Sequence, residues 1–208
     1  MKKVSFVIPC YRSANTIGVV VDEIRDTMST LPEYDYEIIL VNDCSPDNTL
    51  EVISALALSD SRITAVDLAK NFGQHAALMS GISHSTGDFV VCLDDDGQTP
   101  ANEVGKLLAR LEQDDCDVAM ASYEHKQHSA FRNFGTKLNN RMTEIMLGKP
   151  RDLSMTSYFA IKRFIVDEML KYKNCFPYLD GLILRCTRRI RTVPVLHRAR
   201  MEGSSGYT

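Results

Sequence analysis

Short apolar runs alternate with amphipathic helical patterns along most of the chain, and this alternation constrains the fold more than any other feature. Residues 4–8 form the first apolar run, which Pro9 closes. The next segment places apolar side chains at helical spacing, namely at Ile17, Val20, Val21, Ile24 and Met28. Further runs predict strands at residues 38–41, 63–68, 89–93, 118–121, 158–161 and 190–195. The pattern predicts an α/β fold, with a central, mostly parallel sheet covered by helices on both faces.

Helices are expected between and after these strands, around residues 50–56, from residue 74, at 104–111, around 138–146, before residue 170 and near residue 179. Thr99 and Pro100 are predicted to form the cap and first turn of the helix at 104–111. The regular alternation ends near residue 122, which divides one domain into an α/β half, residues 1–122, and an α+β half, residues 123–208. The chain stops at Thr208 within a loop-like stretch, so we expect it to be a piece of a longer protein.

The composition argues against several classes of protein. The 208 residues include 24 basic and 27 acidic side chains, and the resulting net charge of −3 argues against nucleic-acid binding. Six cysteines without a Cys-x-x-Cys pair predict reduced thiols rather than zinc ligands or a disulfide framework. No apolar run approaches the roughly 18 residues that span a bilayer, and no signal peptide opens the chain, so we expect these residues to be soluble.

Three consecutive carboxylates, Asp94, Asp95 and Asp96, follow the strand at residues 89–93. In parallel sheets, ligands bind beyond the carboxyl ends of the strands, so the loops after the first four strands are expected to line one crevice. Adjacent like charges raise one another's pKa, and a hard divalent cation such as Mg²⁺ or Mn²⁺ removes that cost. Side chains alternate along extended backbone, so Asp94 and Asp96 are predicted to share a face and bind the metal. A solvated acidic turn is the alternative.

The loops after the second and third strands carry weaker signals. Asp43 is a candidate to accept a hydrogen bond from a nucleobase, although a turn with Asp47 or Asn48 as a helix cap explains the same sequence. Lys70 is a candidate phosphate contact, although a loop lysine is usually a solvated charge.

The loop after the first strand offers an aromatic face beside polar groups. Tyr11 is a candidate to pack against a nucleobase, whereas Ser13 or Asn15 also fits an ordinary helix cap.

Six arginines gather near the end of this acidic chain, namely Arg185, Arg188, Arg189, Arg191, Arg198 and Arg200. They predict either a solvated face or a docking surface for a phosphate or an anionic membrane. The five histidines lack metal-ligand spacing, and neither a Gly-x-Ser-x-Gly elbow nor a Walker loop is present.

Taken together, these loops resemble the family 2 glycosyltransferases of the GT-A fold, and within them the polyprenyl-phosphate sugar transferases. Residues 41–49 resemble the family's V-D-D-G-S-x-D-x-T element, and residues 71–78 resemble its R-N-[FY]-G loop. Residues 93–98 are similar to the D-x-D-x-Q metal motif, and residues 200–205 to the R-x-x-G-x-S acceptor loop. The resemblance extends over nearly the whole chain.

The resemblance implies a set of site residues. It assigns nucleotide contacts to Pro9, Tyr11, Asn15, Asp43, Lys70, Asp94 and Asp95. It assigns the metal to Asp94 and Asp96, and the acceptor to Arg132, Arg198, Arg200 and Ser205. Asp94, Asp96 and Asp152 are the implied catalytic residues, with Asp152 matching the family pattern after a one-residue shift.

This sequence also departs from the family pattern. Residues 12–15 stand where the family has Asn-Glu-Glu, and Gly206 stands where a lysine often follows the loop serine.

The implied function is transfer of a sugar, with inversion, from a nucleoside-diphosphate sugar, with UDP expected, to a polyprenyl phosphate. The resemblance implies Mg²⁺ or Mn²⁺ as cofactor, a membrane surface as partner, and a place at the cytoplasmic face of the membrane, with further membrane helices beyond Thr208. A homo-oligomer is left open. Two alternatives remain: a transferase of the same fold that glycosylates a sugar hydroxyl in a cell-wall or capsular polysaccharide, and a non-catalytic nucleotide-sugar sensor.

Overall fold

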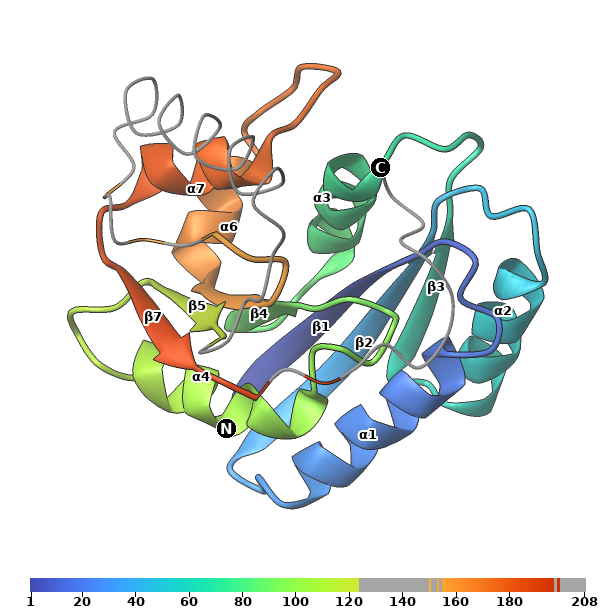
Figure 1. Ribbon diagram of the computed structural model, residues 1–208, viewed down its shortest axis with the longest axis horizontal. Coiled ribbons are helices and arrows are strands. Elements are labelled where there is room, and N and C mark those ends of the chain that lie inside the picture. Colours follow the sequence, from blue (N-terminus) through green and yellow to red (C-terminus); the bar gives the residue numbers. More distant parts are fainter. Residues whose placement is uncertain (124–149, 151–152, 154, 197, 199–208) are drawn as a thin grey trace, which may run out of the picture.

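A seven-stranded sheet organises the part of the chain that the computed structural model describes, which is residues 1–123, 150, 153, 155–196 and 198 (Figure 1). From one side of the sheet to the other, the strands are β3 (Ile63–Asp67), β2 (Tyr34–Asn42), β1 (Lys2–Cys10), β4 (Phe89–Cys92), β6 (Phe159–Lys162), β5 (Val118–Ser122) and β7 (Ile190–Pro194). Strands from both sides of residue 122 therefore lie in the same sheet.

Six of these strands run in one direction. β1 pairs in parallel with β2 and β4, β2 with β3, and β5 with β7. β6 runs antiparallel to both of its neighbours, β4 and β5. We call the end at which the six parallel strands finish the carboxyl edge of the sheet, and the opposite end the amino edge.

Helices cover both faces of the sheet. On one face lie α1 (Ile17–Ser29), α2 (Thr49–Ser59), the short 3-10 helix η1 (Ala101–Glu103) and α4 (Val104–Leu111), and on the other α3 (Gln74–His84), α6 (Arg163–Met169) and α7 (Leu179–Cys186). This arrangement follows from the sequence, because β4 is apolar and buried at every position, and β1 is buried from Val4 onward, so both strands must be covered on both sides.

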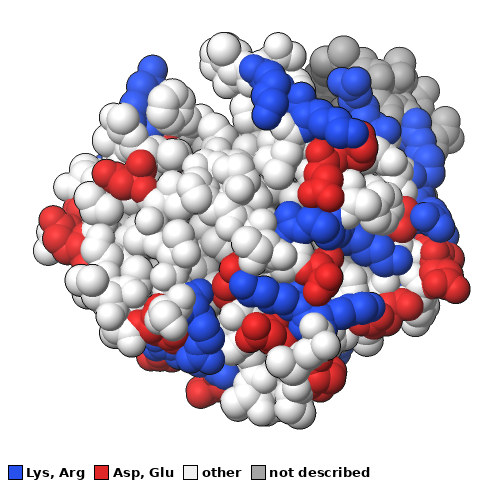
Figure 2. All heavy atoms as spheres, turned by 180° about the vertical axis from the view of Figure 1, so that it is seen from behind, with Lys and Arg blue, Asp and Glu red and all other residues white. Residues whose placement is uncertain are grey.

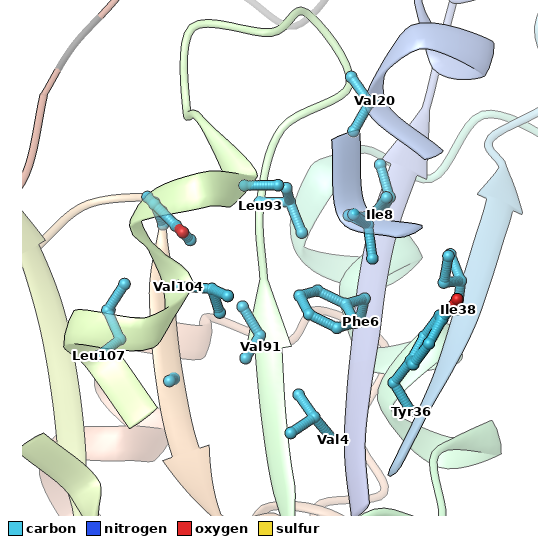
Figure 3. Close-up of a cluster of buried hydrophobic side chains, with 14 of the residues drawn as sticks. Val4, Phe6, Ile8, Val20, Tyr36, Ile38, Val91, Leu93, Val104 and Leu107 are labelled. Carbon is cyan, nitrogen blue, oxygen red and sulfur yellow. The ribbon is translucent and has the colours of Figure 1, made fainter. Parts of the chain in front are cut away.

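The core forms two layers because side chains of a strand alternate between its faces. Phe6 and Ile8 of β1 point to the face of α1 and α4, where Figure 3 shows them beside Val91 of β4 and Leu93, which directly follows it. Val7 points to the opposite face, under α3. There a Cβ built on Gly81 would lie 2.4 Å from a Val7 methyl group, so the absence of a side chain lets α3 approach the sheet closely.

The predicted fold class is confirmed, and all seven predicted strands are present. Six of them agree with their expected limits within two residues, whereas β2 begins four residues earlier than predicted. The prediction for Thr99 and Pro100 was wrong in detail. Pro100 precedes η1 rather than an α-helix, and the Thr99 hydroxyl accepts a hydrogen bond from the N–H of Asp94 (3.2 Å) instead of capping. The helix predicted around residues 138–146 lies outside the described residues. No helix in the described part of the chain is both long enough and apolar enough to cross a membrane.

Candidate functional site

Hydrogen bonds join the loops that follow β1, β2 and β3 at the carboxyl edge. The N–H of Arg12 donates to the Ser45 hydroxyl (2.8 Å), which links the first loop to the second. The N–H groups of Phe72 and Gly73 donate to the two carboxylate oxygens of Asp43 (2.8 and 2.9 Å), which links the second loop to the third. These three loops therefore form one continuous surface.

Sharp backbone reversals shape each of the four loops. In the described part of the chain, positive φ angles occur at four residues, one in each loop: Arg12 (59°), Cys44 (51°), Gly73 (85°) and Gly97 (71°). Glycine adopts this conformation readily, whereas a residue with a Cβ is strained there. The left-handed turns at Arg12 and Cys44 thus mark the first two loops as places where the fold tolerates local strain.

Asp95 ties the acidic loop after β4 to the loop after β1. Its Oδ2 accepts hydrogen bonds from the N–H of Tyr11 (3.2 Å) and from the Ser13 hydroxyl. Burial, together with the charges of Asp94 and Asp96, raises the pKa of Asp95 to about 6, although the two hydrogen bonds act in the opposite direction. Asp95 therefore joins the fourth loop to the first, so the four loops lie together at the carboxyl edge. That they line one crevice stays a prediction.

Asp94 is directed to the other side of the loop, as its alternation with Asp95 predicts. Its Oδ1 accepts a hydrogen bond from Nε2 of Gln74 at the start of α3 (2.9 Å). Its Oδ2 accepts one from the Ser157 hydroxyl, just before β6 (2.5 Å). The carboxylate is thus fixed by groups from two elements on the face of the sheet that carries α3 and α7.

Asp96 lies at the turn of the acidic loop. Its Oδ1 accepts a hydrogen bond from the N–H of Gln98 (2.9 Å), and Gly97 between them provides the left-handed turn. The carboxylate oxygens of Asp94 and Asp96 are the hard donors that Mg²⁺ and Mn²⁺ prefer, so these residues fit the predicted cation. Within the described residues, no three His, Cys, Asp or Glu side chains converge as a complete metal site. Magnesium sites with one or two carboxylates usually obtain their other ligands from water and substrate phosphates.

Asp43 is fully buried, and both of its oxygens are used to hold the N–H groups of Phe72 and Gly73. Its observed contacts therefore position the loop that carries Lys70. The predicted hydrogen bond to a nucleobase stays a prediction.

The other predicted nucleotide contacts surround this loop surface. Pro9 is buried within β1, opposite Val41, directly before the first loop. Tyr11 is half-buried, whereas Asn15 and Lys70 are exposed. Lys70 Nζ lies 5.7 Å from the centre of the Phe72 ring, so this lysine packs along its own loop.

Only one predicted acceptor residue is described. The N–H of Arg198 donates to the backbone carbonyl of Gln98 (3.1 Å), which places the segment after β7 directly against the acidic loop. Its guanidinium group pairs with Glu23 of α1 (2.8 Å). Arg132, Asp152, Arg200 and Ser205 lie outside the described residues.

The described arginines near the end of the chain do not gather on one surface, whereas a docking surface would require them to do so. Arg191 opposes Ala119 near the start of β5, so it lies at the amino edge, whereas Arg198 lies at the carboxyl edge. Arg189 and Arg191 are paired with Asp117 (2.9 Å) and Asp115 (3.1 Å). Figure 2 shows the molecule from behind the view of Figure 1. In the half that contains α6, α7, β5 and β7, basic and acidic side chains are interleaved. The described arginines therefore favour the solvated, ion-paired face.

Three residues around Asp94 were not predicted from the sequence. Gln74 directly follows the third loop. The expectation that the loops meet at one edge of the sheet therefore already implied that Gln74 lies near the site. Ser157 had no such signal, because its position depends on the antiparallel return of β6. Tyr123, just after β5, is half-buried beside the acidic loop, where burial and then the charges of Asp94 and Asp96 raise its pKa.

Comparison with known proteins gives the family of this arrangement. The model of the family described as "Glycosyl transferase family 2" matches residues 5–170. An undecaprenyl-phosphate 4-deoxy-4-formamido-L-arabinose transferase from Klebsiella pneumoniae subsp. pneumoniae is 33% identical over 209 aligned positions. The alignment covers 100% of this chain and 63% of the relative, so the chain spans less than two thirds of the relative's length.

Solved structures share the fold at low sequence identity. The chain resembles glucosyl-3-phosphoglycerate synthase from Mycobacterium tuberculosis in complex with Mn²⁺, UDP-glucose and phosphoglyceric acid, with a TM-score of 0.64, 17% identity, and coverage of 98% of this chain and 73% of that one. It also resembles a mannosyltransferase from Pyrobaculum calidifontis in complex with GDP-mannose and Mn²⁺, with a TM-score of 0.58, 19% identity, and coverage of 80% and 46%.

Proposed function

Since this chain belongs to glycosyl transferase family 2 and has its GT-A fold, we propose that it transfers a sugar from a nucleoside-diphosphate sugar to a polyprenyl phosphate. The name of the 33% identical relative, an undecaprenyl-phosphate sugar transferase, supports this acceptor class. Fold neighbours bind UDP-glucose and GDP-mannose, so the fold itself accommodates either base. Uridine is the proposed base.

The four linked loops are the proposed donor site. Tyr11 and Asn15 of the first loop and Asp43 of the second are proposed to meet the nucleoside. Lys70 is exposed on the loop that Asp43 holds, where its ammonium group can approach the diphosphate. Pro9 and Asp95 are proposed to shape the floor of this site, because Pro9 is buried beneath the first loop and Asp95 binds that loop to the acidic turn.

Asp94 and Asp96 are proposed to hold Mg²⁺ or Mn²⁺. A bound cation would neutralise charge on the departing diphosphate, a contribution typically worth several kcal/mol. The protein's part is to present two carboxylates in a fixed arrangement, which Gln74 and Ser157 achieve for Asp94 by binding one oxygen each.

A phosphate acceptor reduces the demand for a general base. The second pKa of a phosphate monoester is about 6, so the attacking oxygen is already ionised at neutral pH. A direct attack on the anomeric carbon would invert its configuration. Arg198 lies against the acidic loop, and we propose that it binds the acceptor phosphate together with Arg132, Arg200 and Ser205. Asp152 keeps its proposed catalytic place as the family resemblance assigns it.

The proposed acceptor is a lipid, so the reaction would take place at a membrane surface, on its cytoplasmic face. A homo-oligomer there would not alter the residues assigned to the site.

The observation that carries the proposal is the acidic loop at the end of β4. The loop after β1 holds Asp95, while Gln74 of α3 and Ser157 before β6 hold Asp94. Asp96→Ala is expected to abolish Mn²⁺-dependent binding of the nucleotide sugar, measured by calorimetry. Glu51→Ala, which removes an exposed carboxylate of α2, is the matched control and is expected to bind as the parent does. Unchanged affinity in Asp96→Ala would refute the metal role.

A screen of UDP-, GDP- and CDP-sugars by thermal shift with Mn²⁺ would identify the donor, because a ligand of the native state raises its stability with its excess over Kd. Turnover with a polyprenyl phosphate, and none with a sugar hydroxyl, would then separate the proposal from the transferase that modifies a polysaccharide. Donor binding without turnover on any acceptor would instead indicate a nucleotide-sugar sensor.

A further inference from the structure

The connection between α6 and α7, residues 170–178, holds an aromatic ring out in solvent. Phe176 is 89% exposed, and in Figure 1 the connection projects beyond both helices. The Tyr172 hydroxyl donates a hydrogen bond to the backbone carbonyl of Phe176 (2.9 Å), which closes the turn that carries the ring. Tyr178, at the end of the connection, is 41% exposed. The fold therefore presents an aromatic tip at a defined place.

The composition of this connection distinguishes it from the single exposed apolar side chains that are common on soluble proteins. Residues 170–178 contain three aromatic side chains, two lysines and no carboxylate, although the chain as a whole has a net charge of −3. Both lysines, Lys171 and Lys173, are exposed. Lys171 pairs with Glu168 (2.5 Å), and such an exposed pair contributes little, so another anion can replace the glutamate. The connection is thus an aromatic, basic projection on an acidic protein.

Aromatic rings beside lysines are typical of segments that lie at a lipid–water interface. There the ring is buried at the boundary between headgroups and acyl chains, while the lysines keep their ammonium groups among anionic headgroups. A stable protein interface, in contrast, buries roughly 800 Å² on each partner. One projecting turn offers little of that area, whereas a bilayer accepts a single inserted ring. The chemistry of the connection therefore favours an anionic bilayer over a protein partner.

The connection also lies beside the proposed metal site. Because β6 runs antiparallel, α6 begins at the amino edge and leads back towards the carboxyl edge. There the Tyr178 ring meets the His75 ring edge to face, with the ring centres 5.4 Å apart. His75 directly follows Gln74, whose side chain donates a hydrogen bond to Asp94 (2.9 Å). The first residues of α3 therefore link the aromatic tip to the acidic loop.

We infer that residues 170–178 dock the carboxyl edge on an anionic bilayer, with Phe176 inserted between headgroups and Lys171 and Lys173 contacting lipid phosphates. The inference rests on the proposed function, because a lipid acceptor whose chains stay in the bilayer must bring its phosphate to this edge. It gives the contact with the membrane surface to one described segment, whereas the described arginines near the end of the chain are spread over both edges.

The first test uses the absence of tryptophan from the sequence. Phe176→Trp introduces a single fluorescent reporter at the tip, and Leu58→Trp introduces one at an equally exposed position (91%) of α2, on the other face of the sheet. Both are titrated with vesicles of three parts brominated phosphatidylcholine to one part phosphatidylglycerol. The emission of Phe176→Trp is expected to shift to shorter wavelength and to be quenched at least twofold. The emission of Leu58→Trp is expected to stay unchanged.

The second test separates the ring from the charges. Phe176→Ser is expected to lower binding to the same vesicles about tenfold in a sedimentation assay, because the apolar side chain that enters the bilayer is lost. Lys173→Glu is expected to lower it at least threefold, and so is omission of phosphatidylglycerol. Leu58→Ser is the matched control and is expected to bind as the parent does. The affinity of Phe176→Ser for a nucleotide sugar with Mn²⁺ is expected to stay within twofold of the parent.

Two outcomes would overturn the inference directly: no quenching of Phe176→Trp by brominated lipid, or equal quenching of Leu58→Trp. Vesicle binding that does not depend on phosphatidylglycerol would overturn the role of the lysines. A shift without lipid that grows with protein concentration would also overturn the inference, because it indicates contact with a second copy of the chain. The proposed function fails separately, when no UDP-, GDP- or CDP-sugar binds with Mn²⁺, whatever the vesicles show.

Discussion

Carboxylate side chains have different partners at the two edges of the sheet. At the amino edge, carboxylates meet cations: Glu37 binds Lys3 (2.6 Å), Asp60 binds Arg25 and Arg62, and Asp117 binds Arg189. At the carboxyl edge, the hydrogen bonds that fix Asp43, Asp94 and Asp95 come from backbone N–H, amide and hydroxyl donors.

The pKa values follow this difference. Hydrogen bonds from Arg62, outweighing some desolvation, hold the pKa of Asp60 well below its usual range. Burial raises the pKa of Asp95 to about 6, and the two neighbouring carboxylates add to the rise. The amino edge thus uses its negative charges to stabilise the fold. At the carboxyl edge, the charge of Asp95 costs stability, as expected of a group retained where a ligand binds.

The largest expected effect is on activity at the carboxyl edge. Asp94→Ala is expected to lower turnover with Mn²⁺ by about a thousandfold, roughly 4 kcal/mol of activation free energy, because one of the two proposed metal ligands is lost. Its unfolding midpoint in EDTA is expected to equal or exceed that of the parent, since one of three adjacent like charges is removed. Initial rates and thermal unfolding measure the two quantities. If Asp94→Ala keeps turnover within tenfold of the parent, this carboxylate is not required for activity, and the proposed difference between the two edges is wrong.

The next effect is on stability at the amino edge. Asp117 is buried and accepts hydrogen bonds from Thr187 (2.7 Å) and Arg189 (2.9 Å). Asp117→Asn is expected to lower the free energy of unfolding by about 2 to 3 kcal/mol, because the negative charge that strengthens these bonds is removed in a buried position. Urea unfolding measures the change, with the exposed Asp114→Asn as control. Turnover of the folded variant is expected to stay within twofold of the parent.

Asp95→Asn is expected to stabilise the metal-free protein. A carboxyl whose pKa is raised to about 6 in the folded state contributes stability below its unfolded value near 4 and loses it as the pH rises through 6. The neutral variant should therefore exceed the parent by about 1 to 2 kcal/mol at pH 7.5 and match it at pH 4. Urea unfolding at both pH values in EDTA checks this. If Asp95→Asn is less stable than the parent at pH 7.5, the charge of Asp95 does not destabilise the folded protein, and the prediction is wrong.

Glu37→Gln is expected to show the opposite dependence on pH. Although burial acts against it, hydrogen bonds from Lys3, Ser5 and Thr86 lower the pKa of Glu37 to about 2. Its contribution is present above the unfolded value near 4.5 and is lost as the pH falls towards 2. The variant should be about 1 kcal/mol less stable than the parent at pH 7, a modest value because Lys3 is partly exposed. The difference should narrow below pH 4.5 in the same urea titrations.

The sequence predicts the fold well because periodicity is a local signal. Each strand and most helices follow from the spacing of apolar residues, and the acidic loop follows from its place after the most apolar strand. The partners of Asp94 depend instead on which strands lie next to β4. Nothing local shows that residues 159–162 return antiparallel between β4 and β5, so Ser157 was not predicted beside the site. The arginines were grouped because they are near in sequence, although β7 separates them by its full length.

The insertion of β6 between β4 and β5 has a consequence for proteolysis. After a backbone break following Tyr123, the first fragment would contain β4 and β5. The strand that lies between them and pairs with both, β6, would belong to the second fragment. The second fragment would hold β6 but neither of its neighbours. Such nicked protein is therefore expected to persist as a noncovalent complex of complementary fragments, which separate only when the whole sheet unfolds.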